Sequence, residues 1–131
     1  MSASGRVVLV LVFGGLLLGT TGAGLAADLF TPLLPGLPGV DAFHCIVTNV
    51  GTRAVTVAVA AIDQSNLVVA SRGPVVIGQG NFASAGFIAS ALHDDGRCVF
   101  EIQGSKTQIR AHLCIVNTST GGTCQARADA Y

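Results

Sequence analysis

The residues of this chain that could do chemistry are four cysteines and the histidines beside two of them. His44 directly precedes Cys45, and His112 lies two positions before Cys114. Zinc sites usually use cysteine pairs about two to four residues apart, and no such pair occurs here. His44 and Cys45 would point to opposite faces of a strand, whereas His112 and Cys114 would share one. A metal site at His112 and Cys114 is therefore geometrically open, but the spacing does not favour it.

Two further stretches could take part in chemistry, and both have simpler interpretations. "HDDG" (93–96) could hold a cation through its carboxylates, but it lacks the ligand number of a calcium loop, so we interpret it as a solvated hairpin turn. "GSKT" (104–107) ends like a phosphate-binding loop, yet it lacks the earlier glycine and lies between strands. No G-x-S-x-G elbow is present. The sequence predicts no enzyme activity, no catalytic residues, no metal and no cofactor.

The first 27 residues have the pattern of a secretory signal peptide. Arg6 is the only charged residue before Asp28, and an apolar run with small residues follows it to Ala27. We expect cleavage near Ala26 or Ala27. The same run is just long enough to cross a bilayer, so an uncleaved membrane anchor is the alternative, and contact with a membrane is expected only in that case.

An even number of cysteines after an export signal indicates two disulfides. A loop from Asn117 to Gly121 would place Cys114 opposite Cys124 in a hairpin, close enough to bridge. Cys45 would then pair with Cys98, closing a long loop worth about 4 kcal/mol in the chain-entropy model. We favour this pairing, and the sequence leaves the other two connectivities open.

Charge excludes two classes of partner. The sequence has 7 Lys and Arg and 7 Asp and Glu, and only 11% of its residues are charged. Without Arg6, the exported part has a net charge near −1 and no cluster of cations. Phosphate backbones and anionic lipid surfaces both need clustered cations, so we expect no nucleic acid partner.

From residue 43 onward, short runs of β-branched and small apolar residues alternate with turn residues about every 8–12 positions, which is typical of an all-β fold. We predict an Ig-like antiparallel β-sandwich of about seven strands over 43–131. A proline-rich extended leader (28–42) would precede it. The predicted strands are 43–50, 54–62, 66–72, 81–90, 97–103, 107–116 and 122–129.

Alternation along these strands assigns their faces. The core face of 97–103 should hold Cys98, Phe100 and Ile102, and that of 107–116 should hold its odd-numbered residues from 109 to 115. The strand 54–62 is apolar on both faces. It should therefore be central, or its outer face should be covered by the leader or by a neighbouring molecule.

Residues 44–90 carry a resemblance to a known family. "VTNVGTRAVTVAVAAIDQSNLVVAS" followed by "PVVIGQGNFASAGFIAS" resembles the front half of bacterial Ig-like domains of the adhesion-related CARDB type, in which an Asn-x-Gly turn links two valine-rich strands. The four cysteines lie outside that pattern. The resemblance implies a binding or spacer module with no catalytic residues to carry over.

We therefore expect an exported, non-catalytic binding or structural module that is secreted, periplasmic or on the cell surface. Its partner would be a protein or a cell-envelope component. The alternative is a small secreted inhibitor or effector that presents rigid loops to an enzyme, since a disulfide lowers the ordering cost of binding. The candidate interaction loops contain His93, Asp94, Asp95, Asn117, Thr118 and Ser119.

Overall fold

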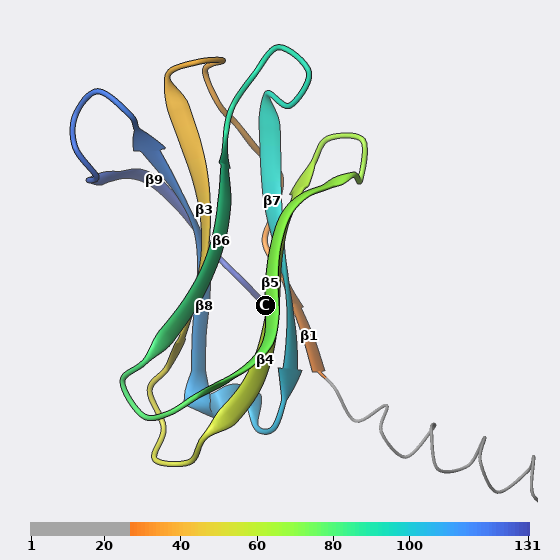
Figure 1. The fold of residues 1–131 in the computed structure, drawn as a ribbon, viewed down its shortest axis with the longest axis vertical. Coiled ribbons are helices and arrows are strands. Elements are labelled where there is room, and N and C mark those ends of the chain that lie inside the picture. Colours follow the sequence, from red (N-terminus) through yellow and green to blue (C-terminus); the bar gives the residue numbers. More distant parts are fainter. Residues whose placement is uncertain (1–26) are drawn as a thin grey trace, which may run out of the picture.

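The computed structural model describes residues 27–131, which form two antiparallel β-sheets packed face to face (Figure 1). The predicted all-β, Ig-like sandwich is confirmed, with nine strands rather than about seven. The helical element of this part is a short 3-10 turn, Lys106–Gln108. Over the same residues, no helix is long and apolar enough to span a membrane. The predicted signal peptide (1–27) lies outside the described residues, apart from its last position.

Sheet A has five strands and sheet B has four. The order in sheet A is β1 (Ala27–Phe30), β7 (Asp95–Gln103), β4 (Val55–Asp63) and β5 (Val68–Ile77), and β2 (Leu34–Pro35) also pairs with β7. The order in sheet B is β6 (Phe82–Ile88), β3 (Asp41–Asn49), β8 (Ile109–Asn117) and β9 (Cys124–Asp129). All pairs are antiparallel, which allows each sheet to bury one face and solvate the other.

The segment 28–42 is part of the sandwich, which corrects the prediction of a leader outside it. β1 pairs with β7 from Ala27 opposite Ile102 onward, and β2 pairs with the start of β7. Leu29 is buried in the core. These strands were not predicted because proline interrupts the alternating pattern of a strand. Proline is nevertheless tolerated in a short strand at a sheet edge.

The other predicted strands agree with the structure to within two residues at each end, except β5. β5 continues to Ile77, five residues beyond its predicted end, through Gly73 and Pro74. Among residues 27–131 it pairs only with β4, so Pro74 removes no hydrogen bond from a central ladder. β4 lies between β7 and β5, which confirms its predicted central position.

Strand connectivity matches the immunoglobulin pattern at its centre and departs from it at its edges. β3 pairs with β6 and β4 pairs with β7, as strands B and E and strands C and F do in that pattern. The first strand, β1, lies beside β7, where an immunoglobulin domain has its last strand. The later strand β8 lies beside β3, where the first strand would be. The two outer positions are therefore exchanged, and the C-terminal strands extend sheet B.

The core lies between the sheets and is made by alternate residues. Phe43, Phe100, Ile102 and Leu113 are completely buried, and each such side chain contributes about 1.5–3 kcal/mol through burial. The predicted core faces of β7 and β8 are confirmed, because Cys98, Phe100 and Ile102 and the odd-numbered residues from 109 to 115 are all buried.

Asn49 is a fully buried polar residue at the end of β3. Its Nδ2 donates to the carbonyl oxygens of Arg53 (2.6 Å) and Ile77 (3.0 Å), and its Oδ1 accepts from the N–H of Gly51 (2.9 Å). The side chain thereby joins the turn 50–54 to the end of β5. A buried amide with this many partners is stabilising only while all of them remain paired.

We expect Asn49→Ala to lower the free energy of unfolding by about 1–3 kcal/mol, because it leaves buried backbone groups unpaired. Urea unfolding of both proteins would measure the difference. Asn81→Ala, at an exposed position, is the control and should change stability by no more than about 0.5 kcal/mol. Equal effects of the two substitutions would contradict this role for Asn49.

Candidate functional site

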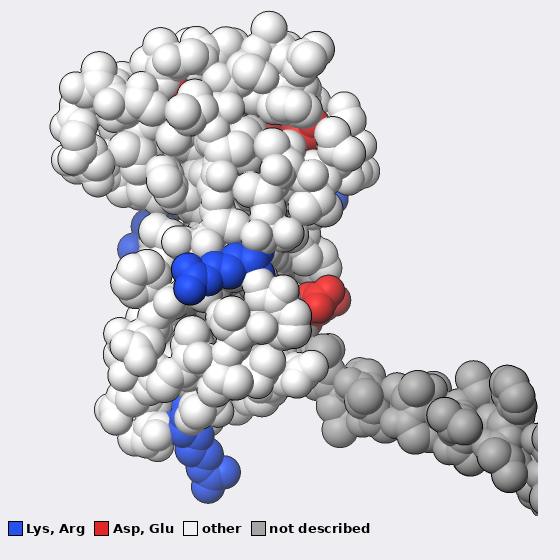
Figure 2. Space-filling model, viewed as in Figure 1, with Lys and Arg blue, Asp and Glu red and all other residues white. Residues whose placement is uncertain are grey.

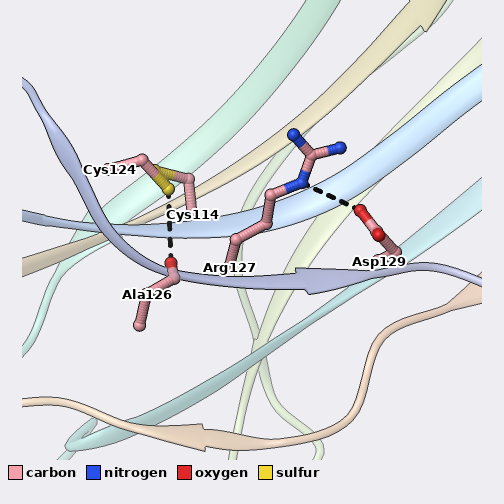
Figure 3. Close-up of a disulfide and its surroundings, with 5 residues drawn as sticks. All are labelled: Cys114, Cys124, Ala126, Arg127 and Asp129. Atoms are coloured by element: carbon pink, nitrogen blue, oxygen red, sulfur yellow. Dashed lines mark hydrogen bonds and ion pairs between the residues drawn. A yellow bond between two sulfur atoms is a disulfide. The ribbon is translucent and has the colours of Figure 1, made fainter.

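All four cysteines form disulfides, in the pairing that the sequence favoured. Cys45 on β3 and Cys98 on β7 join the two sheets through the core, and neither has any exposed surface. Cys114 on β8 and Cys124 on β9 join neighbouring strands of sheet B (Figure 3). Because the Cys114 sulfur is bonded to another sulfur, it cannot act as the thiolate ligand that a site with His112 would need.

The second disulfide does not join directly opposed residues, which corrects the predicted hairpin geometry. Cys114 lies opposite Arg127, and Cys124 lies opposite Val116. The register shifts between Ile115 and Val116, so β9 has one residue more than β8 at this point, as in a β-bulge. The bulge brings the two Cα atoms to 5.5 Å although the residues are not a cross-strand pair.

Arg127 and Asp129 accompany this disulfide on the exposed side of β9. Arg127 Nε donates to Asp129 Oδ1 at 2.9 Å (Figure 3). Both side chains are more than half exposed, so the ion pair adds little stability. Cys124 Sγ lies 3.3 Å from the carbonyl oxygen of Ala126, a close contact without a hydrogen bond because a disulfide sulfur has no proton.

Four connections meet at one end of the sandwich, at the top of Figure 1. We call this surface the loop end and define it as residues 36–40, 64–67, 89–94 and 118–123. The register of sheet B places Asp41, Asn117 and Ile88 at this end, and that of sheet A places Asp63 and Gly96 there. β1 begins opposite Ile102, near the other end of the molecule.

The segment 89–94 lies at the centre of the loop end and bonds to the segments beside it. Gly36 N–H donates to the carbonyl oxygen of Asp94 at 2.7 Å, and Gly39 N–H donates to that of Ala89 at 2.7 Å. On the other side, Gln64 Nε2 donates to the carbonyl oxygen of Leu92 at 2.9 Å. These bonds fix three connections relative to one another.

The fourth connection, 118–123, is attached through Val40. The backbone N–H and the hydroxyl of Thr118 both donate to the Val40 carbonyl oxygen, at 2.8 and 2.9 Å. Asn117 Oδ1 accepts from the N–H of Ser119 at 2.9 Å, which shapes the start of the turn. The Cys114–Cys124 disulfide closes the base of this loop, so the loop end is a continuous, preorganised layer.

Asp63 and His93 form the one side-chain ion pair that the described residues make across the loop end. His93 Nδ1 lies 2.6 Å from Asp63 Oδ2, and Asp63 is 2% exposed. Asp63 Oδ1 also accepts from the N–H groups of Ser65 and Leu67, both at 2.9 Å. Burial raises the pKa of Asp63, but the hydrogen bonds from Leu67, His93 and Ser65 and the charge of His93 outweigh it. The pKa therefore lies below its usual value of 3.8.

This depressed pKa predicts a specific pH dependence. A carboxylate with a lower pKa in the folded state stabilises the fold above its unfolded pKa, and loses that contribution as the pH falls through the folded value. We expect Asp63→Asn to be less stable than the unmodified protein above pH 3.8, because the hydrogen bonds from Leu67 and Ser65 stabilise the carboxylate throughout that range. The gap should close as the pH drops below that value. Thermal unfolding of both proteins from acidic to neutral pH would measure this stability difference. A difference that already disappears near neutral pH would contradict a lowered pKa at Asp63.

The structure brings the two predicted interaction loops to the same end but gives them different roles. Thr118 and Ser119 are exposed, and Asn117 is half-buried. His93, Asp94 and Asp95 are also half-buried, and Asp95 already belongs to β7. The predicted solvated hairpin turn at 93–96 is therefore wrong. The chain crosses there from sheet B to sheet A, and the His93 ring points to Asp63.

The apolar side chains of the loop end were not predicted from the sequence. Leu37 is 63% exposed, Leu67 is 56% exposed and Leu92 is 78% exposed, and each lies in a different connection. Val40 adds 36%. The upper part of Figure 2, which is the loop end, is almost free of charged side chains. Large apolar residues beside turn residues were the available signal, since buried strands normally contain such residues and turns do not.

His112 lies on the outer face of sheet B. Its Nδ1 is buried without a hydrogen-bond partner, and it lies opposite Asp129. Burial and the nearby Arg127 charge lower the pKa of His112, and Asp129 opposes them. Over residues 27–131, no three histidine, cysteine or carboxylate side chains are grouped closely enough to hold a metal ion. His112 therefore has no partners for the metal site that the sequence left open.

The fold and its cross-links define the class of protein as a disulfide-stapled antiparallel β-sandwich. In comparisons with family models, curated proteins and solved structures, none matched the chain. The two disulfides fit an oxidising environment outside the cytosol.

Proposed function

We propose that this protein is an exported, non-catalytic module that binds a protein of the cell envelope or the extracellular space through the loop end. The observation that carries the proposal is the exposure of Leu37, Leu67 and Leu92 from three connections that hydrogen bonds hold together. Apolar side chains on a rigid support are typical anchors of a binding surface, because little ordering is needed when a partner covers them.

The charges of the loop end favour a protein partner over an anionic lipid surface. Asp94 of the loop end and Asp95 directly after it contribute acidic groups, and the side chain of Arg97, in β7, donates to Asn66 of the loop end. Anionic headgroups would need several unpaired cations close together. An apolar patch with a partly acidic rim fits a protein surface that is apolar at its centre.

A non-catalytic role is supported by the surroundings of His93. Asp63 and His93 are arranged like the acid and base of a hydrolytic triad. The neighbouring hydroxyl, Ser90 Oγ, accepts from the backbone N–H of His93 at 3.2 Å, and within residues 27–131 the ring hydrogen-bonds to Asp63 and not to this hydroxyl. The pair instead connects the turn after β4 to the segment before β7, which is a structural task.

The proposal includes export from the cytosol and a relationship to the CARDB-type domains. The signal-like segment before Ala27 and two disulfides together support secretion, periplasmic location or display at the cell surface. The resemblance of residues 44–90 to CARDB-type domains supports a binding or spacer role. We propose the same kinship here, with the exchanged edge strands as a departure from the immunoglobulin pattern.

The test is site-specific photo-crosslinking in the cells that produce the protein. A photoreactive residue at Leu92, 78% exposed, probes the loop end, and one at Val50, 49% exposed and in the turn after β3, is the control at the opposite end. We expect a discrete crosslinked protein from Leu92 and none from Val50. Crosslinks from both positions alike, or from neither, would remove the support for a binding surface at the loop end.

The alternative role, an inhibitor or effector of an enzyme, would use the same surface. Its specific support is the loop 118–123, which the Cys114–Cys124 disulfide closes and Thr118 ties to Val40. If the protein crosslinked through Leu92 is an enzyme, its activity should fall when the purified module is added. A crosslinked enzyme that keeps full activity would exclude inhibition.

A further inference from the structure

Besides the two-residue strand β2, which contains Pro35, residues 27–131 form four edge strands, and three of them are protected from pairing with other chains. β5 contains Pro74, and β9 presents the charges of Arg127 and Asp129. The last residue of β1, Phe30, is also covered by the C-terminal residue Tyr131. These two residues exchange two backbone hydrogen bonds of 3.1 Å. Proline, charges and coverage are the usual means by which proteins prevent edge-to-edge association.

The fourth edge strand, β6, has none of these features. Its sequence, FASAGFI, contains no charged residue and no proline. Phe82 is 63% exposed and Ile88 is 61% exposed, at the two ends of the strand. Among residues 27–131, β6 pairs only with β3, so its other side has no ladder partner. Figure 1 shows β6 at the front of the molecule, and in the same view Figure 2 shows mostly uncharged residues, with one Lys or Arg side chain across the middle of the face.

The hydrogen-bond pattern identifies which backbone groups of β6 face outward. The ladder with β3 is bracketed by bonds from Ala89 N–H to the Asp41 carbonyl (2.8 Å) and from Asn49 N–H to the Asn81 carbonyl (2.9 Å). Hydrogen-bonded pairs alternate along an antiparallel ladder, so the odd-numbered residues of β6 bond to β3. The N–H and C=O groups of the even-numbered residues, from Phe82 to Ile88, therefore point to the open edge.

We propose that β6 pairs antiparallel with β6 of a second copy of this chain, about a two-fold axis at Ala85. In this register, Phe82 lies opposite Ile88 of the second copy, and Ser84 lies opposite Gly86 of the second copy. The outward-facing groups of the two strands then become the hydrogen-bonded pairs of the new ladder. The two sheets B join into one continuous sheet across the dimer.

The strand is suited to its own copy because the pairing is self-complementary. Each end combines an aromatic with a β-branched side chain, a favourable cross-strand pair. The centre combines small residues, Ser84 and Gly86, and no like charges meet because β6 has none. A two-fold interface uses the same surface on both copies, so the assembly closes as a dimer. The antiparallel arrangement directs the two loop ends in opposite directions, which leaves both accessible.

Sedimentation equilibrium of the protein recovered from an exporting host, from micromolar to millimolar concentration, tests the proposal. We expect a monomer–dimer equilibrium. Phe82→Lys and Ile88→Glu should each weaken dimerisation at least tenfold, because each places a charge opposite an apolar side chain. The double variant should recover most of the loss, since the introduced ammonium group then faces the introduced carboxylate of the other copy. Val76→Lys, 69% exposed on the neighbouring edge strand β5, is the matched control and should dimerise normally.

Amide hydrogen exchange of the unmodified protein gives a second readout that needs no variant. The amides of Ser84 and Gly86 should exchange more slowly as concentration rises, and those of Ala83 and Ala85, which bond to β3, should be protected at every concentration. A monomer throughout, an open-ended assembly, no rescue in the double variant, or concentration-independent exchange at Ser84 and Gly86 would each overturn the proposal.

Discussion

Replacing Cys45 and Cys98 together by alanine is expected to lower the free energy of unfolding by about 4 kcal/mol. The disulfide joins residues 53 positions apart and holds the two sheets together through the core. Its removal restores entropy to the unfolded chain, and the entropy lost on closing a loop grows with loop length. A domain of this size has a total stability of only about 5–15 kcal/mol, so the double variant should be marginal.

Guanidinium unfolding under non-reducing conditions measures this effect, and the second disulfide provides the control. Cys114 and Cys124 are only 10 positions apart and cross-link strands that are already paired. Replacing both by alanine should lower the free energy of unfolding by a smaller amount, about 3 kcal/mol or below. A larger loss from the short cross-link than from the long one would contradict the role of the inter-sheet disulfide.

Phe43→Ala is expected to lower the free energy of unfolding by about 3–5 kcal/mol and to loosen the loop end. The ring is completely buried, and its centroid lies 4.9 Å from that of Phe87. A Cβ at Gly36 or Gly96 would come within 2.6 or 2.7 Å of this ring, so both glycines are needed for the close approach. The Phe43 ring therefore packs against the 36–40 connection from its core side.

Thermal or chemical unfolding measures the loss, and Phe82→Ala is the matched control because it truncates the same side chain at a position that is 63% exposed. The measurement is made at low protein concentration, where self-association is negligible. The free energy of unfolding should then fall in Phe82→Ala by well under half of the loss in Phe43→Ala. Hydrogen exchange at Gly36 and Gly39 should quicken in Phe43→Ala alone. Unchanged exchange at both would show that the loop end does not depend on the ring.

Local patterns predicted most of the fold because its strands alternate clearly. In β7 and β8 every second residue is apolar, and the predicted core faces match the buried ones. β1 and β2 were missed because Pro32, Pro35 and Pro38 interrupt their pattern, although pairing with β7 holds them in place. The exchanged edge positions depend on which strand covers which edge, and alternation within a strand carries no such information.

The candidate site was less predictable because it depends on contacts between distant residues. Asp63 and His93 are 30 positions apart, and no local pattern connects the turn after β4 to the segment before β7. The disulfide pairing was predicted correctly, but the directly opposed hairpin positions assumed for Cys114 and Cys124 were wrong because of the bulge at Ile115 and Val116. Leu37, Leu67 and Leu92 converge only because the sheets bring their connections to the same end.

The proposed function depends on one condition, that the chain is exported and forms both disulfides before it acts. The intact mass of the protein recovered from the producing cells tests it most directly. We expect a chain that begins near Asp28 and lacks four hydrogens, two for each disulfide, and whose mass rises accordingly on reduction. The mass of the whole chain with four free thiols would contradict both export and disulfide formation.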